Sequence, residues 1–186
     1  GYTEGDLDGQ VNSGRRDAFI SKFNPDGTRE WTKLLGTSGD DEGYALTTGS
    51  DGSIYIAGMT EGDLDGQTNN GGEYAFISKY NSDGTKEWTK LLGTAEEDEG
   101  YALTTGSDGS IYIAGVTRGD LDGQTNNGER DAFISKYNPD GTREWTKLLG
   151  TSESDEGYAL TTGSNGSIYI AGYIGGDFDG QVNSGR

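Results

Sequence analysis

The chain has 186 residues, of which 32 are acidic, 14 basic and 34 glycine, and its net charge is −18. It contains no cysteine and no histidine, so the usual ligands of zinc, haem and iron–sulfur sites are missing, and thiol and Ser-His chemistry are excluded. The acidic charge disfavours nucleic acid and membranes as partners and favours divalent cations, and no apolar run is long enough to span a bilayer.

The sequence repeats with a period of 57 residues. Trp31 recurs at Trp88 and Trp145, and Asp6 recurs at Asp63, Asp120 and Asp177. Three periods fill 171 positions, and the remaining residues 172–186 match residues 1–15 nearly one for one. A repeat of this length indicates one supersecondary unit per period.

Each period predicts four strands, called A to D here. In the middle copy they are Tyr44–Thr48, Ser53–Thr60, Tyr74–Tyr80 and Lys86–Leu92. Strands A and B flank Asp51-Gly52, a hairpin pair in which both residues can adopt positive φ. The run 54–57 is apolar at successive positions, which indicates a strand covered on both faces.

These strands predict an all-β fold. Trp88 alternates with charged residues in strand D, so burial is expected to fall from strands A and B to strand D, as from the inside to the outside of a propeller blade. Four antiparallel strands per repeat therefore indicate a β-propeller. The chain divides into residues 1–42 (a loop and strands C and D of a shared blade), 43–99 and 100–156 (full blades), and 157–186 (strands A and B of a shared blade, and a loop).

The predicted 12 strands amount to three blades, whereas propellers have about 4–8. Left alone, three blades would expose apolar sheet faces and unpaired strand edges. Either the chain is part of a longer array of repeats, or copies assemble head to tail and share a blade. Two copies would give six blades and three would give nine.

The strings Gly5-Asp-Leu-Asp-Gly-Gln10, Asp17-Ala-Phe-Ile-Ser-Lys22 and Gly52-Ser-Ile-Tyr-Ile-Ala-Gly58 resemble the bacterial β-propeller repeat known as the SBBP repeat. The resemblance extends over essentially the whole chain, three times over. It implies a secreted or cell-surface bacterial protein. Residues 26–31 also resemble the tryptophan-docking motif of quinoprotein propellers, and we expect this tryptophan to pack between blades.

The loop after strand B is the first candidate site. It carries an Asp-x-Asp-Gly motif in four copies, whose carboxylates are Asp6, Asp8, Asp63, Asp65, Asp120, Asp122, Asp177 and Asp179. Two carboxylates one residue apart, followed by glycine, suit calcium, which prefers hard oxygen ligands. The alternative is a turn in which each carboxylate accepts backbone N–H groups.

The loop between strands D and A is the second candidate site. It is acidic in every copy, as in Asp40-Asp-Glu42, and each copy keeps one Asp-Glu pair: Asp41-Glu42, Asp98-Glu99 and Asp155-Glu156. We expect this loop to be solvated. Identical pairs in each repeat also argue against a single catalytic centre, because an acid and a base require different surroundings.

The amide-rich stretch Gln67-Thr-Asn-Asn-Gly-Gly72 and its copies form the third candidate site, because amide and aromatic groups together suit sugar recognition. A plain flexible loop is the alternative.

The sequence therefore favours a non-enzymatic extracellular scaffold for display, adhesion or protein interaction, with calcium as the candidate cofactor. A lectin-like glycan-binding propeller is the alternative function.

Overall fold

The computed structural model describes residues 1–184; residues 185–186, at the end of the predicted segment 157–186, lie outside the described part. The described residues form 13 strands and contain no helix, so none that could cross a membrane. The strands are β1 (Tyr2–Thr3), β2 (Asp17–Phe23), β3 (Arg29–Leu35), β4 (Asp41–Thr48), β5 (Ile54–Thr60), β6 (Tyr74–Tyr80), β7 (Lys86–Leu92), β8 (Asp98–Thr105), β9 (Ile111–Thr117), β10 (Asp131–Tyr137), β11 (Arg143–Leu149), β12 (Asp155–Thr162) and β13 (Ile168–Ile174).

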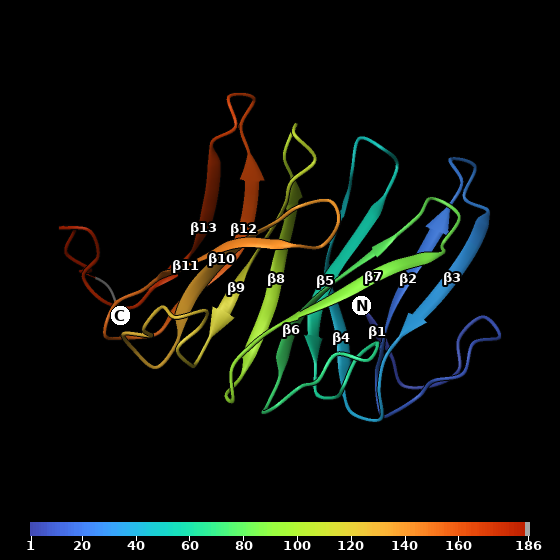
Figure 1. Cartoon of the computed structure of the whole chain (residues 1–186), viewed down its shortest axis with the longest axis horizontal. Coiled ribbons are helices and arrows are strands. Elements are labelled where there is room, and N and C mark those ends of the chain that lie inside the picture. Colours follow the sequence, from blue (N-terminus) through green and yellow to red (C-terminus); the bar gives the residue numbers. More distant parts are fainter. Residues whose placement is uncertain (185–186) are drawn as a thin grey trace.

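These strands form four antiparallel sheets that stand side by side along the chain (Figure 1). Two are complete blades, β4-β5-β6-β7 and β8-β9-β10-β11, and two are partial, β1-β2-β3 and β12-β13. The A strands of successive blades are neighbours, because β4 contacts β8 and β8 contacts β12. The predicted propeller of four-stranded blades is confirmed, and its sheets do not close into a ring.

Strands C and D of the middle repeat have the predicted bounds, Tyr74–Tyr80 and Lys86–Leu92. The predicted total of 12 strands is wrong by one, because Tyr2–Thr3 pairs with the start of β2 and forms the short strand β1. In sequence, Tyr2 and Thr3 are the repeat equivalents of Met59 and Thr60. The extra strand is therefore the last part of a strand B.

The predicted order of burial is only partly correct. Strands β5, β6 and β9 are buried almost throughout, whereas β4 and β8, both A strands, are partly exposed. Strands B and C each have a hydrogen-bonded strand on both sides within the blade, while strand A is an edge strand that contacts the A strands of neighbouring blades. Strand D is the less buried outer strand, as expected.

The A–B turn differs from the predicted geometry. Gly52 has φ of 82°, but Asp51 is not in the positive-φ region. Gly49 N–H donates to the Ser53 carbonyl at 2.8 Å, and Ser53 N–H donates to the Asp51 carboxylate at 2.9 Å. The aspartate therefore stabilises the turn through its side chain, as Asx residues commonly do, and glycine alone supplies the positive φ.

Each strand A carries a β-bulge at its tyrosine. The pairing of β4 with β5 shifts between Gly43 and Ala45, which leaves Tyr44 as the extra residue. The same shift precedes Ala102 and Ala159. A bulge re-aims a side chain, and here it aligns the tyrosines from blade to blade: the rings of Tyr44 and Tyr101, and of Tyr101 and Tyr158, have centroids 5.6 Å apart.

The tryptophan of strand D packs between blades, as predicted. A Cβ atom added to Gly84, in the C–D turn of the second blade, would lie 3.0 Å from the Trp31 ring of the first. Trp88 has the same relation to Gly141, and its Nε1 donates to the Pro139 carbonyl at 3.3 Å. Only glycine leaves room for a ring this close to the turn.

Candidate functional site at the loop end of the blades

The two ends of each blade differ in character. At the turn end lie the short A–B and C–D turns. At the other end, which we call the loop end, strands B and D stop and strands A and C start. In the middle repeat the loop end comprises residues 61–73 and 93–97 together with the adjoining strand termini. All three candidate sites of the sequence analysis lie at the loop end.

Each Asp-x-Asp-Gly motif forms a tight two-residue turn. Leu7 N–H donates to the Gln10 carbonyl and Gln10 N–H donates to the Leu7 carbonyl, each at 3.0 Å. Asp8 and Gly9 both have positive φ, 55° and 75°, a geometry that Asp-Gly pairs adopt readily. Asp65, Asp122 and Asp179 have φ of 53°, 54° and 48°, so the turn recurs in every copy.

Seven of the eight predicted calcium ligands have protein partners. Asp6 accepts the Asn12 backbone N–H at 3.0 Å, and Asp63, Asp120 and Asp177 accept the corresponding asparagine N–H. Asp8 forms an ion pair with Arg29, Asp65 with Lys86 and Asp122 with Arg143. Over residues 1–184, no group of three or more acidic side chains is arranged to hold a metal ion.

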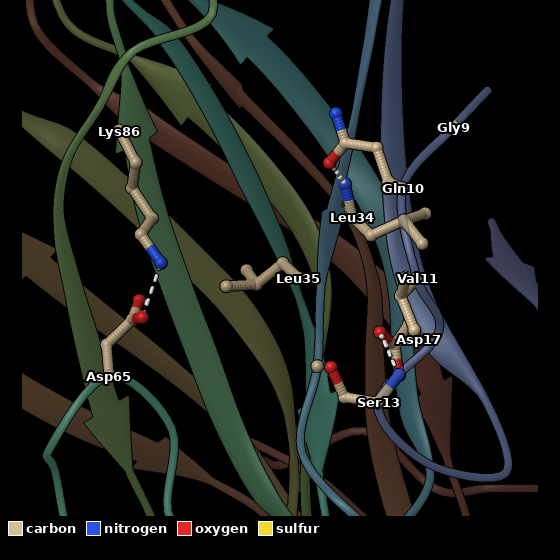
Figure 2. Close-up of a pocket in the computed structure, with 10 residues that line it drawn as sticks. Gly9, Gln10, Val11, Ser13, Asp17, Leu34, Leu35, Asp65 and Lys86 are labelled. Atoms are coloured by element: carbon tan, nitrogen blue, oxygen red, sulfur yellow. Dashed lines mark hydrogen bonds and ion pairs between the residues drawn. The ribbon is translucent and has the colours of Figure 1, made fainter. Parts of the chain in front are cut away.

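A recess of about 360 Å³ separates the first Asp-x-Asp-Gly loop from the second blade. Figure 2 shows Gln10 and Ser13 on one side and the Lys86–Asp65 ion pair on the other. Asp17, a residue that is only 1% exposed, also lines the recess, and its Oδ2 accepts the Ser13 N–H at 3.0 Å. On the other side of the recess, the Asp65 carboxylate is neutralised by its ion pair with Lys86.

A glutamine that follows the turn fastens this loop to strand D. Gln10 Nε2 donates to the Thr32 carbonyl at 2.8 Å, and its Oε1 accepts the Leu34 N–H at 3.2 Å. Gln67 holds Thr89 and Leu91 of β7 in the same way. Sequence reasoning missed this role, although the identity of Gln10, Gln67, Gln124 and Gln181 could have indicated it.

The asparagine of the predicted sugar-binding stretch is similarly engaged. Asn69 Nδ2 donates to the carbonyls of Thr60 at 3.1 Å and Gly72 at 2.8 Å, and its backbone N–H is held by Asp63. The two amides that recur in every copy, Gln67 and Asn69, therefore support the loop itself. Asn70, which is serine in the first copy, is the exposed amide of this stretch.

The Asp-Glu pairs are not in a solvated loop, and that expectation is wrong. Asp41, Asp98 and Asp155 begin the A strands and are 0% exposed. Asp41 Oδ2 accepts the Thr37 N–H at 2.6 Å and the Thr37 hydroxyl at 2.9 Å, and Thr60 donates to Oδ1. Through these hydrogen bonds the aspartate organises the junction between strands D, A and B. Burial raises the pKa of Asp41 and Asp98.

Differences between the repeats concentrate at the loop end. Three sets of equivalent positions reverse the sign of their charge from copy to copy: Glu4, Glu61 and Arg118; Arg15 and Glu129; Arg16, Glu73 and Arg130. All of them lie in the B–C loops or next to strand C. At the turn end the changes are mild, for example Asn165 in place of Asp51. The loop end is therefore the face on which the blades present different chemistry.

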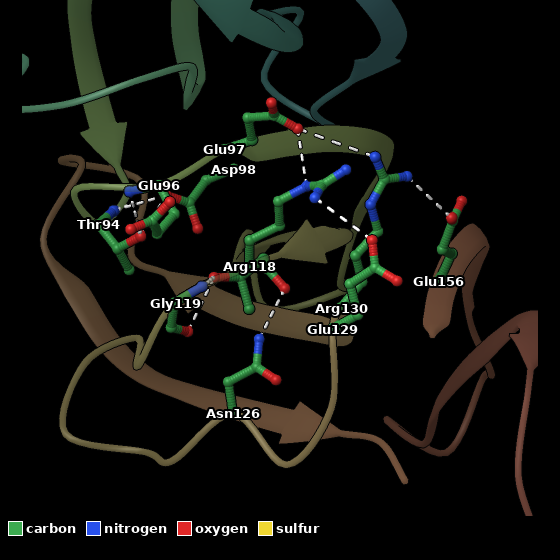
Figure 3. Close-up of polar contacts among 11 residues, drawn as sticks. Thr94, Glu96, Glu97, Asp98, Arg118, Gly119, Asn126, Glu129, Arg130 and Glu156 are labelled. Atoms are coloured by element: carbon green, nitrogen blue, oxygen red, sulfur yellow. Dashed lines mark hydrogen bonds and ion pairs between the residues drawn. The ribbon is translucent and has the colours of Figure 1, made fainter. Parts of the chain in front are cut away.

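Arginine and glutamate side chains form a network across the third repeat (Figure 3). Arg118 Nε lies 2.7 Å from Glu97, and Arg130 lies 3.1 Å from Glu156. In the first repeat Arg16 takes the position of Arg130 and lies 2.6 Å from Glu42. Arg16 and Arg130 thus each neutralise the glutamate at the start of the next strand A.

The second repeat has Glu73 at this position and so lacks the cation. Partial burial, together with Glu99, Glu97, Glu61 and Glu42, raises the pKa of Glu73 to about 7. Burial also raises the pKa of Glu99. The middle of the loop end is therefore a concentration of negative charge flanked by arginine-containing repeats.

Known proteins match most of the chain. The SBBP β-propeller repeat matches residues 30–65, 87–122 and 144–179, and a β-propeller domain of unknown function, DUF5122, matches residues 106–144. Regulatory protein FlaEY of Caulobacter vibrioides is 32% identical over 74% of the chain, and an uncharacterized WD repeat-containing protein, L264, of Acanthamoeba polyphaga mimivirus is 23% identical over 78%. The matches cover only 16% and 13% of these two proteins. Because the repeat matches more than half of the chain, in the same frame in all three periods, the chain belongs to the SBBP β-propeller repeat family.

Proposed function

We propose that the chain is a non-enzymatic interaction scaffold, part of a secreted or cell-surface protein, whose loop end binds a basic protein segment. The observation that carries the proposal is the contrast between the two ends of the blades. The turn end is nearly the same in every repeat, whereas the loop end reverses charge from one repeat to the next. A surface that varies on a constant frame is typical of a recognition face.

The chemistry of the partner follows from the middle repeat. Within residues 1–184, no arginine or lysine forms an ion pair with Glu61, Glu73 or Glu99. The net charge of the chain is −18. An arginine or lysine brought by a partner would take the place that Arg16 and Arg130 occupy in the flanking repeats. Charge complementarity of this kind favours rapid, specific and salt-sensitive association.

An array of short arginine-containing peptides tests the binding proposal. We expect binding that weakens as ionic strength rises, and a loss of about threefold to tenfold for Glu73→Gln, since one charged contact is removed. Asp51→Asn is the matched control, because it removes the same charge at the turn end and reproduces the natural Asn165. Equal losses for the two variants, or binding by neither the parent chain nor the variants, would contradict the proposal.

Calcium remains the candidate cofactor, and we propose the four Asp-x-Asp-Gly loops as its sites. Calcium at millimolar concentration should raise the melting temperature and a chelator should reverse the rise, because binding to the folded state stabilises it. Asp63→Asn should reduce the shift, and Asp51→Asn should leave it unchanged. A melting temperature that is the same in calcium and in chelator would remove calcium from the proposal.

The secreted or cell-surface location is tested separately by protease digestion of intact cells.

A further inference from the structure

Two loops of the first repeat are each closed by a buried aspartate. Asp17 begins β2, and its Oδ2 accepts the Ser13 N–H at 3.0 Å. Asp41 begins β4, and its Oδ2 accepts the N–H and the hydroxyl of Thr37. The first loop leads into strand C and the second into the next strand A. Each aspartate is therefore held in place by the loop that it closes.

The backbone brings these two aspartates side by side. The Asp41 N–H donates at 2.9 Å to the carbonyl of Arg16, the residue before Asp17, and a parallel β-bridge joins the two segments at the same point. A Cβ atom added to Gly36 would clash with the Asp17 carboxylate, and Gly36 directly precedes the threonine that Asp41 holds. Both carboxylates therefore lie against the same short segment, residues 36–37.

The third repeat has the same arrangement. The Asp155 N–H donates to the Arg130 carbonyl at 2.8 Å, and the Asp155 carboxylate accepts the N–H and the hydroxyl of Thr151. Asp131 lies against Gly150 as Asp17 lies against Gly36. We call these two sets, Asp17 with Asp41 and Asp131 with Asp155, the buried aspartate pairs.

The buried aspartate pairs carry charge that has no partner. All four residues are between 0% and 1% exposed. Within residues 1–184, no donor contacts Oδ1 of Asp17 or Oδ1 of Asp131, and no arginine or lysine forms an ion pair with any of the four. Burial and, to a smaller extent, the other aspartate of the pair raise the pKa of Asp41 and Asp131. Two neighbouring carboxylates are costly to keep ionised away from water, so each pair favours a cation.

We infer that each buried aspartate pair binds one calcium ion, at a site distinct from the four Asp-x-Asp-Gly loops. Carboxylates are the hard oxygen ligands that calcium prefers, and the chain has no histidine or cysteine that would select a softer metal. Oδ1 of Asp17 or Asp131 would be the first ligand, and a carboxylate oxygen of Asp41 or Asp155 the second. Water can complete the set of about six to eight oxygens, because calcium accepts a flexible geometry.

The first pair has a path to solvent. The polar recess of about 360 Å³ beside the first Asp-x-Asp-Gly loop is lined by Ser13, Asp17 and Gly36 (Figure 2). The Asp65–Lys86 ion pair on its far side has no net charge, so Asp17 leaves the recess negative. An entry path of this kind is one of the requirements of a metal site.

The second repeat provides an internal comparison. Tyr74 takes the position of Asp17 and Asp131, and a Cβ atom added to Gly93 would clash with its ring. Asp98, which is 0% exposed, therefore has a tyrosine where Asp41 has a second carboxylate. The chain should accordingly have two sites of this kind, and none in the second repeat.

The number of calcium ions bound, measured by isothermal titration calorimetry, tests the inference. Asp17→Asn should bind one ion fewer than the parent chain, and Asp17→Asn combined with Asp131→Asn should bind two fewer. Asp51→Asn is the matched control, because it removes the same charge at the turn end, and it should bind as many ions as the parent. If the Asp-x-Asp-Gly loops bind no calcium, the parent should still bind two ions, so failure of that proposal is distinguishable. An Asp17→Asn chain that binds as many ions as the parent, or a parent that binds none, would overturn the inference.

Tyr74→Asp is the converse test. It should complete a third pair with Asp98 and add one bound ion. Asp17→Tyr introduces the residue that the second repeat already has, so it should lose one ion while circular dichroism shows an unchanged fold. A folded Tyr74→Asp chain that binds no additional ion would contradict the inference, and the asparagine variants test it independently if Tyr74→Asp does not fold.

Melting temperatures separate a bound cation from a shared proton. In chelator, Asp17→Asn should melt above the parent chain, because the amide removes one of two neighbouring buried charges. In calcium at ten times the Kd, each site should raise the melting temperature of the parent by about 3–6 °C, and Asp17→Asn should lose the contribution of one site. A parent whose melting temperature ignores calcium but rises as the pH is lowered from 7 to 5 would show that a proton neutralises the pair, and would overturn the inference.

Discussion

Replacement of Gly58 by alanine should lower the free energy of unfolding by more than about 3 kcal/mol. A Cβ atom at Gly58 would lie 1.7 Å from the Glu42 carbonyl oxygen and 3.0 Å from the Gly43 Cα. Both are backbone atoms of the neighbouring strand β4, so no side-chain rotation relieves the clash. The alanine can be accommodated only if β4 and β5 separate next to the Tyr44 bulge.

Two other glycines make this prediction specific. A Cβ atom at Gly5 would meet nothing within 4 Å, so Gly5→Ala should change stability by less than about 0.5 kcal/mol. Gly52→Ala also meets open space but has φ of 82°, so strain alone should cost about 1 kcal/mol. Thermal and denaturant unfolding should show the smallest loss of stability for Gly5→Ala, a larger loss for Gly52→Ala and the largest for Gly58→Ala. A Gly58→Ala variant as stable as Gly5→Ala would show that the strands are not paired as described.

The sequence predicts the blade well because its period and its strand patterns act together. Strands Tyr74–Tyr80 and Lys86–Leu92 are bounded by turn residues and alternate in polarity, and both have the predicted bounds. The tryptophan of strand D could also be placed between blades, because its spacing of 57 residues ties it to the repeat. Periodicity thus identifies which residues are equivalent, and equivalence is enough to specify the fold.

The same reasoning fails where a polar side chain has a partner far away in sequence. Asp41 was expected in a solvated loop, but two threonines make its burial possible, and one of them, Thr60, lies 19 residues further along the chain. Gln67 fastens its loop to a strand 22 residues away. The bulge at Tyr44 could not be predicted either, because it arises from the close approach of Gly43 and Gly58. These features depend on tertiary contacts that no local pattern records.

Glu73→Arg should stabilise the chain by about 1–3 kcal/mol near pH 7.5. The substitution would place an arginine beside Glu99, as Arg16 lies beside Glu42 and Arg130 beside Glu156. It would also remove a carboxylate that burial and four neighbouring glutamates hold at an unfavourable pKa. Glu73→Gln, which removes the charge without adding a cation, should give only the second part of the gain, about 1–2 kcal/mol after allowance for solvent screening.

The pH dependence separates the two parts. Because the pKa of Glu73 is raised from 4.5 to about 7 in the folded chain, its ionisation costs stability progressively as pH rises between these values, and the cost is complete above about 7. The advantage of Glu73→Gln over the parent chain should therefore vanish near pH 4.5 and reach its maximum above pH 7. Glu73→Arg should exceed Glu73→Gln wherever Glu99 is ionised. Melting temperatures that differ equally at pH 4.5 and pH 7.5 would mean that Glu73 has an ordinary pKa and that the loop end carries no such concentration of charge.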